Sequence, residues 1–409
     1  MNILYIAHRI PYPPNKGDKI RAFHEVQALA QGNNLFLCAL VDDPADWPHE
    51  KRLRELCTDV FLVGLHPRRK KILSLLGLLT GMPMSVFYFH EKKLQKAVDA
   101  LLATHDFDAV VCFSGTSAEY IFRSPLMECC GKNLCSRPRL LMDFCDVDSA
   151  KWKEYAHRAS FPLSLLYRLE GWLLARYERR VAHFFDHSIL ISAQEQQLFA
   201  RTVCNPGTLA VIGNGVDLDY FSPSPAEENV DREAPELLFV GAMDYQANVD
   251  GICWFVETVW PGIGERFPNA VLTIVGRNPS REVVALQKGR NIRVTGTVED
   301  VRPFYRRAAL VVVPLRVARG IQNKVLEAMA MAKPTVVSRN AFIGIEAEPG
   351  QDLLVADSAE DFLAHTIHVL EDCAYGARLA RNARRRMEER YAWSGAMVAL
   401  RDMAAGREG

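Results

Sequence analysis

Short apolar segments alternate with helical patterns in two series along this chain, and this alternation limits the possible folds more than any other feature. The first series has apolar segments at residues 2–8, 34–41, 108–113, 140–144 and 187–192. A helical pattern covers residues 21–31, after the first of these segments. The second series has apolar segments at residues 236–243, 270–276, 292–298, 309–315 and 334–338. Each series predicts a parallel α/β sheet with helices on both faces.

A stretch rich in Pro and Glu, residues 222–235, separates the two series and is the best candidate for a linker. A chain of 409 residues is also too long for one ordinary core. We therefore expect a first domain over residues 1–221 and a second over 236–388. A C-terminal helix over 389–409 is expected to pack back on the first domain. Two Rossmann-like domains of this kind would face a central cleft, with ligands at the carboxyl ends of the strands.

The composition excludes some classes of function. Lys and Arg together number 49, as do Asp and Glu, so no overall positive charge favours nucleic acid as a partner. The chain begins with a short apolar strand rather than a signal peptide, and no run approaches the roughly 20 apolar residues of a membrane-spanning helix. The sequence therefore predicts a cytoplasmic protein.

The ten cysteines are scattered among apolar neighbours, which predicts buried free thiols in a reducing compartment. One cluster, Cys129, Cys130 and Cys135 with Cys145 nearby, lacks the paired spacing of a zinc site. We therefore expect loop thiols there rather than a metal site.

Residues 319–338, RGIQNKVLEAMAMAKPTVVS, contain the strongest candidate site. A helix that opens at Gly320 offers free backbone N–H groups and the positive end of its dipole to a diphosphate. Glu327 lies about two turns further on, where its carboxylate could accept hydrogen bonds from a ribose diol. Lys324 precedes Glu327 by three residues, on the same helical face, and could reach the phosphates.

This segment resembles the nucleotide-sugar site of the retaining glycosyltransferases of family 4, whose signature has the form E-G-F-G-x-x-x-x-E-A-M-A. Glu327 matches the second glutamate, whereas Arg319 occupies the position of the first. The resemblance covers nearly the whole chain and is greatest to the sugar transferases associated with exosortase/PEP-CTERM exopolysaccharide systems of bacteria. It implies the GT-B fold, a nucleoside-diphosphate sugar as donor, and no catalytic metal or other cofactor.

Further segments match the family pattern in the expected order. Residues 211–223, VIGNGVDLDYFSP, resemble its segment at the domain junction, where Asp217 could hold the backbone of the crossover. Residues 239–255 resemble the glycine turn and helix that open the second domain, but no basic residue lies between Gly241 and Trp254. Because that loop lacks a cation, we expect Lys324 to supply the positive charge for the diphosphate, with Arg316 or Arg319 assisting.

Residues 296–308 resemble a loop that reads the nucleobase, which we place near Thr297, Val298 and Glu299, with Arg277 stacking beside it. Asp300 and Tyr305 are interpreted as a helix cap and a core aromatic. The resemblance implies the following donor-binding residues: Gly17, Gly241, Asn248, Arg277, Val298, Glu299, Gly320, Ile321, Gln322, Asn323 and Glu327.

In the first domain, Gly17 matches the glycine of the family's first loop. Lys19 and Arg21 oppose the dipole at a helix start, so a bound anion is a plausible reason for them. The loop after residue 142 carries Asp143, Asp146 and Asp148. Such an acidic loop is a metal candidate, but the resemblance implies instead that Asp146 touches the transferred sugar. The predicted catalytic residues are thus Lys324, Arg319 and Asp146, with no metal ligands.

Residues 67–89 and 160–185 each combine apolar with basic residues. Such segments can lie on an anionic lipid surface, or they can be helices that pack on their own domain. The resemblance adds a lipid-linked glycan acceptor and peripheral contact with the inner membrane. The predicted function is a retaining sugar transfer from a nucleoside-diphosphate sugar to a glycan in exopolysaccharide synthesis. A nucleotide-sugar 2-epimerase and a non-catalytic nucleotide-sugar-binding partner remain the alternatives.

Overall fold

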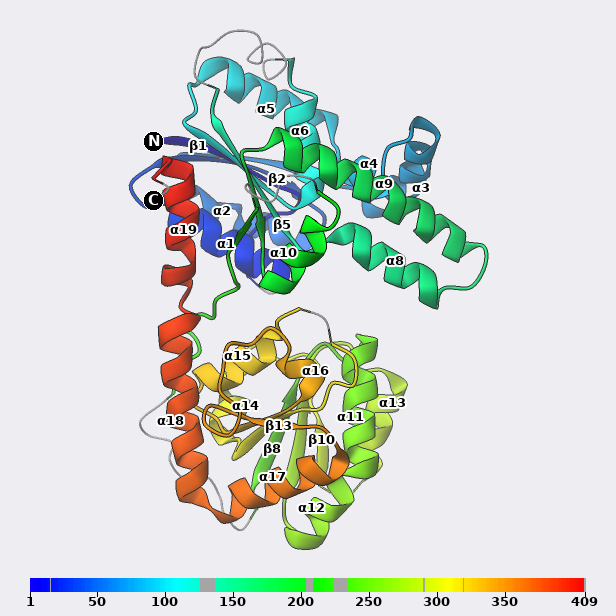
Figure 1. Ribbon diagram of the computed structural model, residues 1–409, viewed down its shortest axis with the longest axis vertical. Helices are drawn as coiled ribbons and strands as arrows, with labels where there is room; N and C mark the ends of the chain where they lie inside the picture. The colour runs from blue at the N-terminus through cyan, green and yellow to red at the C-terminus, as the bar shows by residue number, and fades with distance from the viewer. Residues whose placement is uncertain are drawn as a thin grey trace. The chain divides into compact units, whose positions relative to one another are not determined.

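The computed structural model describes residues 1–14, 16–125, 137–203, 209–223, 234–289, 291–318 and 320–407 (Figure 1). The chain forms two compact units. Unit 1 comprises Met1–Gly213 and Ser394–Gly409, and unit 2 comprises Asn214–Trp393. Arg319, the cysteines Cys129, Cys130 and Cys135, and most of the expected linker lie outside the described residues.

Unit 1 is built on a parallel sheet whose strands follow the order β3-β2-β1-β4-β5-β6-β7. The interior strand β1 is buried on both faces, because Ile3 to Ala7 have no exposed surface, so helices cover the sheet on both sides. The strands are β1 Asn2–Ala7, β2 Asn34–Val41, β3 Asp59–Gly64, β4 Ala109–Phe113, β5 Arg139–Cys145, β6 His187–Leu190 and β7 Leu209–Val211.

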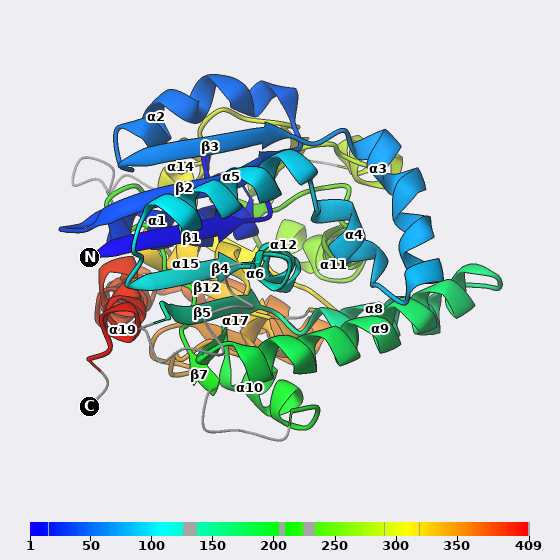
Figure 2. The same ribbon diagram turned by 90° about the horizontal axis from the view of Figure 1, so that it is seen from above.

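Helices connect the strands of unit 1, and two of these helices project beyond the sheet. In Figures 1 and 2, α8 and α9 run side by side as a hairpin that projects away from the sheet. The helices are α1 Gly17–Ala30, α2 Glu50–Arg54, α3 Pro67–Leu73, α4 Met84–Phe89, α5 Lys92–Thr104, α6 Ala118–Phe122, α8 Asp148–Arg158, α9 Leu163–Phe184 and α10 Ala193–Ala200. Short 3₁₀ turns are η1 Pro44–His49, η2 Ser74–Thr80 and η3 Gly115–Ser117.

Unit 2 repeats the plan with a parallel sheet of order β10-β9-β8-β11-β12-β13. Its core is formed by buried side chains of the sheet and of the flanking helices, including Phe239, Phe255 and Met329. The strands are β8 Glu236–Val240, β9 Val271–Val275, β10 Ile292–Val294, β11 Leu310–Val313, β12 Thr335–Ser338 and β13 Leu354–Ala356.

The helices of unit 2 are α11 Gln246–Thr258, α12 Trp260–Arg266, α13 Arg281–Ala285, α14 Arg302–Arg307, α15 Asn323–Ala330, α16 Arg339–Phe342, α17 Ala359–Glu371 and α18 Cys373–Arg390, with a 3₁₀ turn η5 at Leu286–Lys288. The last helix, α19 Trp393–Ala405, belongs almost entirely to unit 1. There the guanidinium of Arg139 donates to the carbonyl oxygen of Ala404 over 3.0 Å.

The predicted fold class, two Rossmann-like α/β domains, is confirmed, but the first domain ends earlier than residue 221. Asn214 onward belongs to unit 2. Val216 pairs with Ala392, and Arg384 donates to the carbonyl oxygen of Phe221, so this segment is tied to the end of α18. As predicted, the Asp217 carboxylate holds the local backbone by accepting from the amide of Tyr220 over 2.9 Å.

Candidate functional site

In a parallel α/β sheet, ligands bind outside the carboxyl ends of the two strands where the strand order reverses. In unit 2 those strands are β8 and β11, which are hydrogen-bonded neighbours. Gly241 follows β8 directly, and α15 begins a short distance after β11. The chain thus brings the predicted Gly241 loop and the predicted helix start to the same edge of one sheet.

Gly241, Asn248 and Lys324 meet at this edge. The side-chain amide of Asn248 donates to the carbonyl oxygen of Ala242 over 2.8 Å, and its oxygen accepts a hydrogen bond from the Lys324 ammonium. A Cβ atom at Gly241 would lie 2.7 Å from Asn248 Nδ2 and 3.1 Å from Lys324 Nζ. Only a glycine therefore allows the backbone to approach these two side chains so closely.

Lys324 is half-buried, and its ammonium lies 5.2 Å from the centre of the Phe239 ring. Burial lowers the pKa of Lys324 to about 8, although the nearby Glu327 carboxylate acts in the opposite direction. The hydrogen-bond partner of this ammonium is a neutral amide. Its charge is therefore well placed to meet an anionic ligand.

Tyr305 holds the Glu327 carboxylate through a hydrogen bond. The Tyr305 hydroxyl donates to Glu327 Oε2 over 3.1 Å, and the tyrosine has no exposed surface. Burial raises the pKa of Glu327, against the opposing effects of this hydrogen bond and of the Lys324 charge. A carboxylate fixed through one oxygen keeps the other available, which suits a diol ligand. Tyr305 is a core aromatic, as predicted, and it also orients the candidate ribose-binding group.

The start of α15 has the geometry of an anion site. Gly320 has a φ of 64°, a left-handed conformation that favours glycine. Gln322 precedes the helix in an extended conformation, and no side chain caps α15. The predicted residues Ile321, Gln322 and Asn323 thus lead into a helix whose first N–H groups receive no side-chain cap.

The predicted base-reading loops follow the next strands of the same sheet. The amide of Gly276, after β9, donates to the carbonyl oxygen of Gly296 over 3.3 Å. This contact brings Arg277, which is exposed, and the loop of Val298 and Glu299 to the same edge as Gly241. Asp300 forms hydrogen bonds with the backbone and side chain of Arg302, at the start of α14, as the helix-cap interpretation requires.

Two other cations, Arg316 and Arg319, were predicted to assist at the diphosphate. Arg319 lies outside the described residues. The Arg316 guanidinium lies 3.4 Å from the Asp250 carboxylate on α11 and is more than half exposed. Among the basic residues proposed for the diphosphate, Lys324 is the one that the described structure places beside Gly241.

In unit 1 the anion explanation for Lys19 and Arg21 is wrong. Both side chains are buried, Lys19 against Asp46 at 2.6 Å and Arg21 against Asp143. Lys19 and Arg21 are among the buried residues of α1, which begins at Gly17, four residues before the predicted start. Gly17 itself faces open space, since nothing lies within 4 Å of the position that a Cβ atom would occupy there.

Asp146 lies in the loop between β5 and α8, and the Lys151 ammonium lies 3.5 Å from its carboxylate and 3.1 Å from that of Asp148. Asp143 is fully buried with Arg21. Each acidic group of this loop therefore faces a cation of the chain. In the part of the chain that the structure describes, no group of three potential ligand residues is arranged to hold a metal ion.

One residue of unit 1 escaped the sequence reasoning. His8 follows β1 at the point where the strand order reverses between β1 and β4. Its Nε2 atom lies 3.5 Å from the Asp18 carboxylate, and its ring stacks on that of Phe113, 5.9 Å away. The signal that could have found it is its position, since a polar residue directly after an apolar strand marks a ligand-binding edge.

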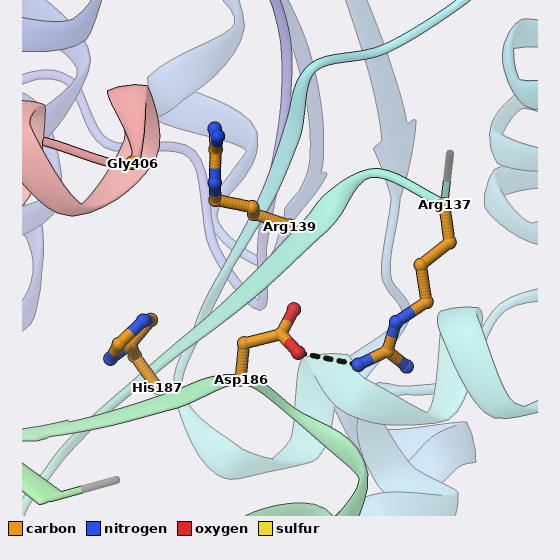
Figure 3. Close-up of a pocket in the computed structure, with 5 residues that line it drawn as sticks. All are labelled: Arg137, Arg139, Asp186, His187 and Gly406. Carbon is orange, nitrogen blue, oxygen red and sulfur yellow. Dashed lines mark hydrogen bonds and ion pairs between the residues drawn. The ribbon is translucent and has the colours of Figure 1, made fainter.

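A cavity of about 390 Å³ lies elsewhere in unit 1. Figure 3 shows its lining residues at the beginnings of β5 and β6, with Arg137 paired to Asp186 and Gly406 nearby. The beginnings of parallel strands are the edge opposite to the ligand-binding one. This cavity is therefore separate from the candidate residues His8 and Asp146. No helix of the described residues is long and apolar enough to cross a membrane.

Part of unit 2 is similar to a known protein family. Residues 234–372 match the family model described as "Glycosyl transferases group 1". The matched segment contains Gly241, Asn248, Lys324 and Glu327. Over this segment, unit 2 is thus similar to the group 1 glycosyl transferases.

Similar proteins span the whole chain. An "uncharacterized 44.6 kDa protein in cps region" of Klebsiella pneumoniae is 21% identical over 95% of this chain and 96% of that protein. Sucrose-phosphate synthase of Thermosynechococcus elongatus has a TM-score of 0.68 at 17% identity, covering 100% of this chain and 99% of that one. HepE of Anabaena, solved with UDP, has a TM-score of 0.67 at 14% identity, covering 99% and 100%.

Proposed function

We propose that this chain, a glycosyltransferase with the GT-B fold, transfers a sugar from a nucleoside-diphosphate sugar to a glycan with retention of the anomeric configuration. The observation that carries the proposal is the cluster of Gly241, Asn248, Lys324 and Glu327 at the switch point of unit 2. A cation, an uncapped helix start and a fixed carboxylate match the diphosphate and the ribose of such a donor. Binding of UDP by Anabaena HepE supports a nucleoside diphosphate as the ligand class.

The reaction breaks the bond between the anomeric carbon and the diphosphate oxygen, and the bonding electrons leave with the diphosphate. A new bond forms between that carbon and the acceptor hydroxyl, on the face from which the diphosphate departs. The hydroxyl proton passes to a phosphate oxygen. The role of the protein is electrostatic, since Lys324 and the N–H groups at the start of α15 stabilise the charge that grows on the leaving group.

The acceptor belongs, in this proposal, to unit 1. His8 and Asp18 lie after β1 at its switch point, where a sugar hydroxyl can exchange hydrogen bonds with an imidazole. The similarity to a protein of a cps region supports a role in exopolysaccharide synthesis. We take the acceptor to be a lipid-linked glycan at the cytoplasmic face of the membrane.

The test is a transfer assay with purified full-length protein, a panel of radiolabelled nucleoside-diphosphate sugars beginning with UDP-glucose, and a lipid extract as acceptor. We expect labelled lipid and free nucleoside diphosphate in equal amounts, and an α-configured product from an α-configured donor by NMR. Isomerised donor in the absence of any acceptor would identify an epimerase instead. Tight donor binding without turnover on any acceptor would identify a non-catalytic partner.

A further inference from the structure

Helix α9 exposes a face that carries apolar and basic side chains but, along its fully described length, no acidic one. Leu165, Leu169 and Trp172 are exposed, and Arg176 and Arg179 continue the same row. The steps of four, three, four and three residues place all five on one side of the helix. Trp172 keeps 56% and Leu165 62% of their surface in solvent, which is unusual for an amphipathic helix whose other side is buried.

The acidic residues of α9 are both turned inward. Glu170 has no exposed surface and accepts from the backbone amides of Met84 and Ser85, at the start of α4, over 2.7 and 2.9 Å. Glu178 accepts from the amide of Ser149, at the start of α8, over 2.9 Å. The glutamates therefore hold neighbouring helices by their positive ends, and the outer surface keeps only positive charge.

The turn that joins α8 to α9 extends the apolar part of this surface. Phe161 is 81% exposed and Leu163 is 49% exposed. Trp152 of α8 packs against Tyr167 of α9 with ring centres 5.2 Å apart, so the two helices form one hairpin. Figures 1 and 2 both show this hairpin projecting from the sheet of unit 1, so its turn is sterically accessible within that unit.

A second segment of unit 1 has the same character. In α3 and the turn that follows it, Ile72 is 72% exposed and Leu75 is 49% exposed, and Arg68, Arg69 and Lys71 are exposed beside them. Both segments predicted from sequence to combine apolar with basic residues thus present these side chains to solvent rather than to their own core.

We propose that the α9 face, defined as Phe161, Leu165, Leu169, Trp172, Arg176 and Arg179, binds the surface of an anionic phospholipid bilayer. Exposed leucine, phenylalanine and tryptophan can enter the boundary between headgroups and acyl chains, while arginines attract anionic headgroups. A second copy of the chain fits less well, because a symmetric contact would place each cationic face against its own equivalent. The inference deepens the lipid-linked acceptor of the proposed function, but it can be measured without sugar transfer.

The experiment is flotation of the full chain with vesicles of phosphatidylcholine alone or mixed with phosphatidylglycerol, at low and high salt. We expect binding to the mixed vesicles that weakens with salt. Arg176→Glu/Arg179→Glu should lower the partition coefficient by about thirtyfold or more, since each basic residue near such a surface contributes about fivefold. Leu165→Ser/Trp172→Ser should lower it at least about tenfold.

Matched controls carry the same chemical changes elsewhere. Val398→Ser alters an exposed apolar residue of α19, and Arg281→Glu reverses an exposed charge at the start of α13. Both controls should float like the wild type, and all variants should keep the wild-type melting temperature.

Wild-type flotation of the α9 variants would overturn the inference, as would equal binding to neutral vesicles. Sedimentation showing a dimer that the α9 variants dissociate would assign the face to a second copy instead. If the variants show the expected flotation pattern but no donor is turned over by any form, the proposed function fails and the membrane surface stands.

Discussion

Lys324 is held by the amide oxygen of Asn248 rather than by a carboxylate, and this choice of partner determines what the residue can do. Burial of this ammonium outweighs the attraction of the nearby Glu327 carboxylate, so a diphosphate that meets its charge would bind favourably. The Glu327 carboxylate is also fixed, because the Tyr305 hydroxyl donates a hydrogen bond to one of its oxygens. Both side chains are therefore held in place by neighbours within unit 2.

Replacing Glu327 tests the ribose contact. Glu327→Ala should raise the dissociation constant of the nucleotide donor by the equivalent of about 1–3 kcal/mol, because a charged hydrogen-bond pair is lost. Isothermal titration calorimetry with UDP and with the sugar-nucleotide donor measures this dissociation constant. Glu327→Gln keeps the side-chain shape and the contact with Tyr305, so its dissociation constant should lie between those of the wild type and of Glu327→Ala. Unchanged affinity in a folded Glu327→Ala protein rejects the assignment.

Removing the Lys324 charge tests the leaving-group role. Lys324→Met keeps most of the stem volume, and it should lower kcat by roughly a hundredfold or more, as when one preorganised electrostatic group is lost. Arg319→Glu, which restores the glutamate of the family signature, should bring no gain if the arginine belongs to the cation set. Steady-state kinetics with saturating donor measures kcat for both variants. Near-normal kcat in Lys324→Met would contradict the leaving-group role.

The pKa of Lys324 predicts a pH dependence. Because burial lowers this pKa to about 8, the ammonium is mostly charged at pH 7 and mostly neutral at pH 9. The reaction needs the charged form, so kcat/KM should fall as pH rises, approaching tenfold per pH unit above the pKa. In Lys324→Arg the fall near pH 8 should disappear, since arginine stays charged. A profile that falls identically in both proteins assigns the titration to another group.

At the scale of elements, the site depends on how closely the loop after β8 approaches α11 and α15. Three successive strand ends carry Gly241, Gly276 and Gly296, and backbone contacts join neighbouring ones. A Cβ atom at Gly276 would lie 1.6 Å from the carbonyl oxygen of Gly241, which no side-chain adjustment relieves. Glycine at position 276 allows its loop to lie close to the Gly241 loop, and in this arrangement Asn248 reaches Lys324.

Gly241→Ala should therefore disturb the site without destroying the sheet. The added methyl would meet Asn248 Nδ2 at 2.7 Å, so the amide must move and its hydrogen bonds weaken. We expect a loss of about 1–3 kcal/mol in the free energy of unfolding, with weaker donor binding. Gly264→Ala is the control, because nothing lies within 4 Å of that position in α12. Helix propensity there predicts stabilisation of up to about 1 kcal/mol, and chemical denaturation compares the two.

At the scale of the whole molecule, the chain consists of two units that repeat one architecture. Each has a parallel sheet whose strand order reverses at its first strand, β1 in unit 1 and β8 in unit 2. Each reversal carries polar candidate residues, namely His8 with Asp18 and Lys324 with Asn248. Each unit therefore places polar side chains at the edge where ligands bind in such sheets.

The reaction as a whole should need no divalent ion. Asp143 in β5 faces Arg21, the carboxylates after β5 face Lys151, and Lys324 is proposed to supply the charge that neutralises the diphosphate. Activity should survive EDTA followed by desalting, within about twofold. An absolute requirement for Mg²⁺ or Mn²⁺ would direct attention back to Asp146 and Asp148 as oxygen ligands.

The sequence alone determined the architecture, because hydrophobic periodicity is a local property that each strand carries in its own residues. The apolar runs of β1, β2, β4 and β8 were visible, whereas β3, β7 and β13 were not among the predicted segments. The sequence also pointed to Gly320, Lys324 and Glu327, since a helix start with a glycine, a cation and a carboxylate has a recognisable spacing.

Only the tertiary structure decided the partners of those residues. Asn248 lies 76 positions from Lys324, Tyr305 lies 22 from Glu327, and Asp143 lies 122 from Arg21. No local pattern encodes such pairs, because folding brings them together through the order of strands in a sheet. The same holds for α9, whose amphipathic sequence suggested either a packed or an exposed helix. Burial of Glu170 and Glu178 against two other helices settled which side faces solvent.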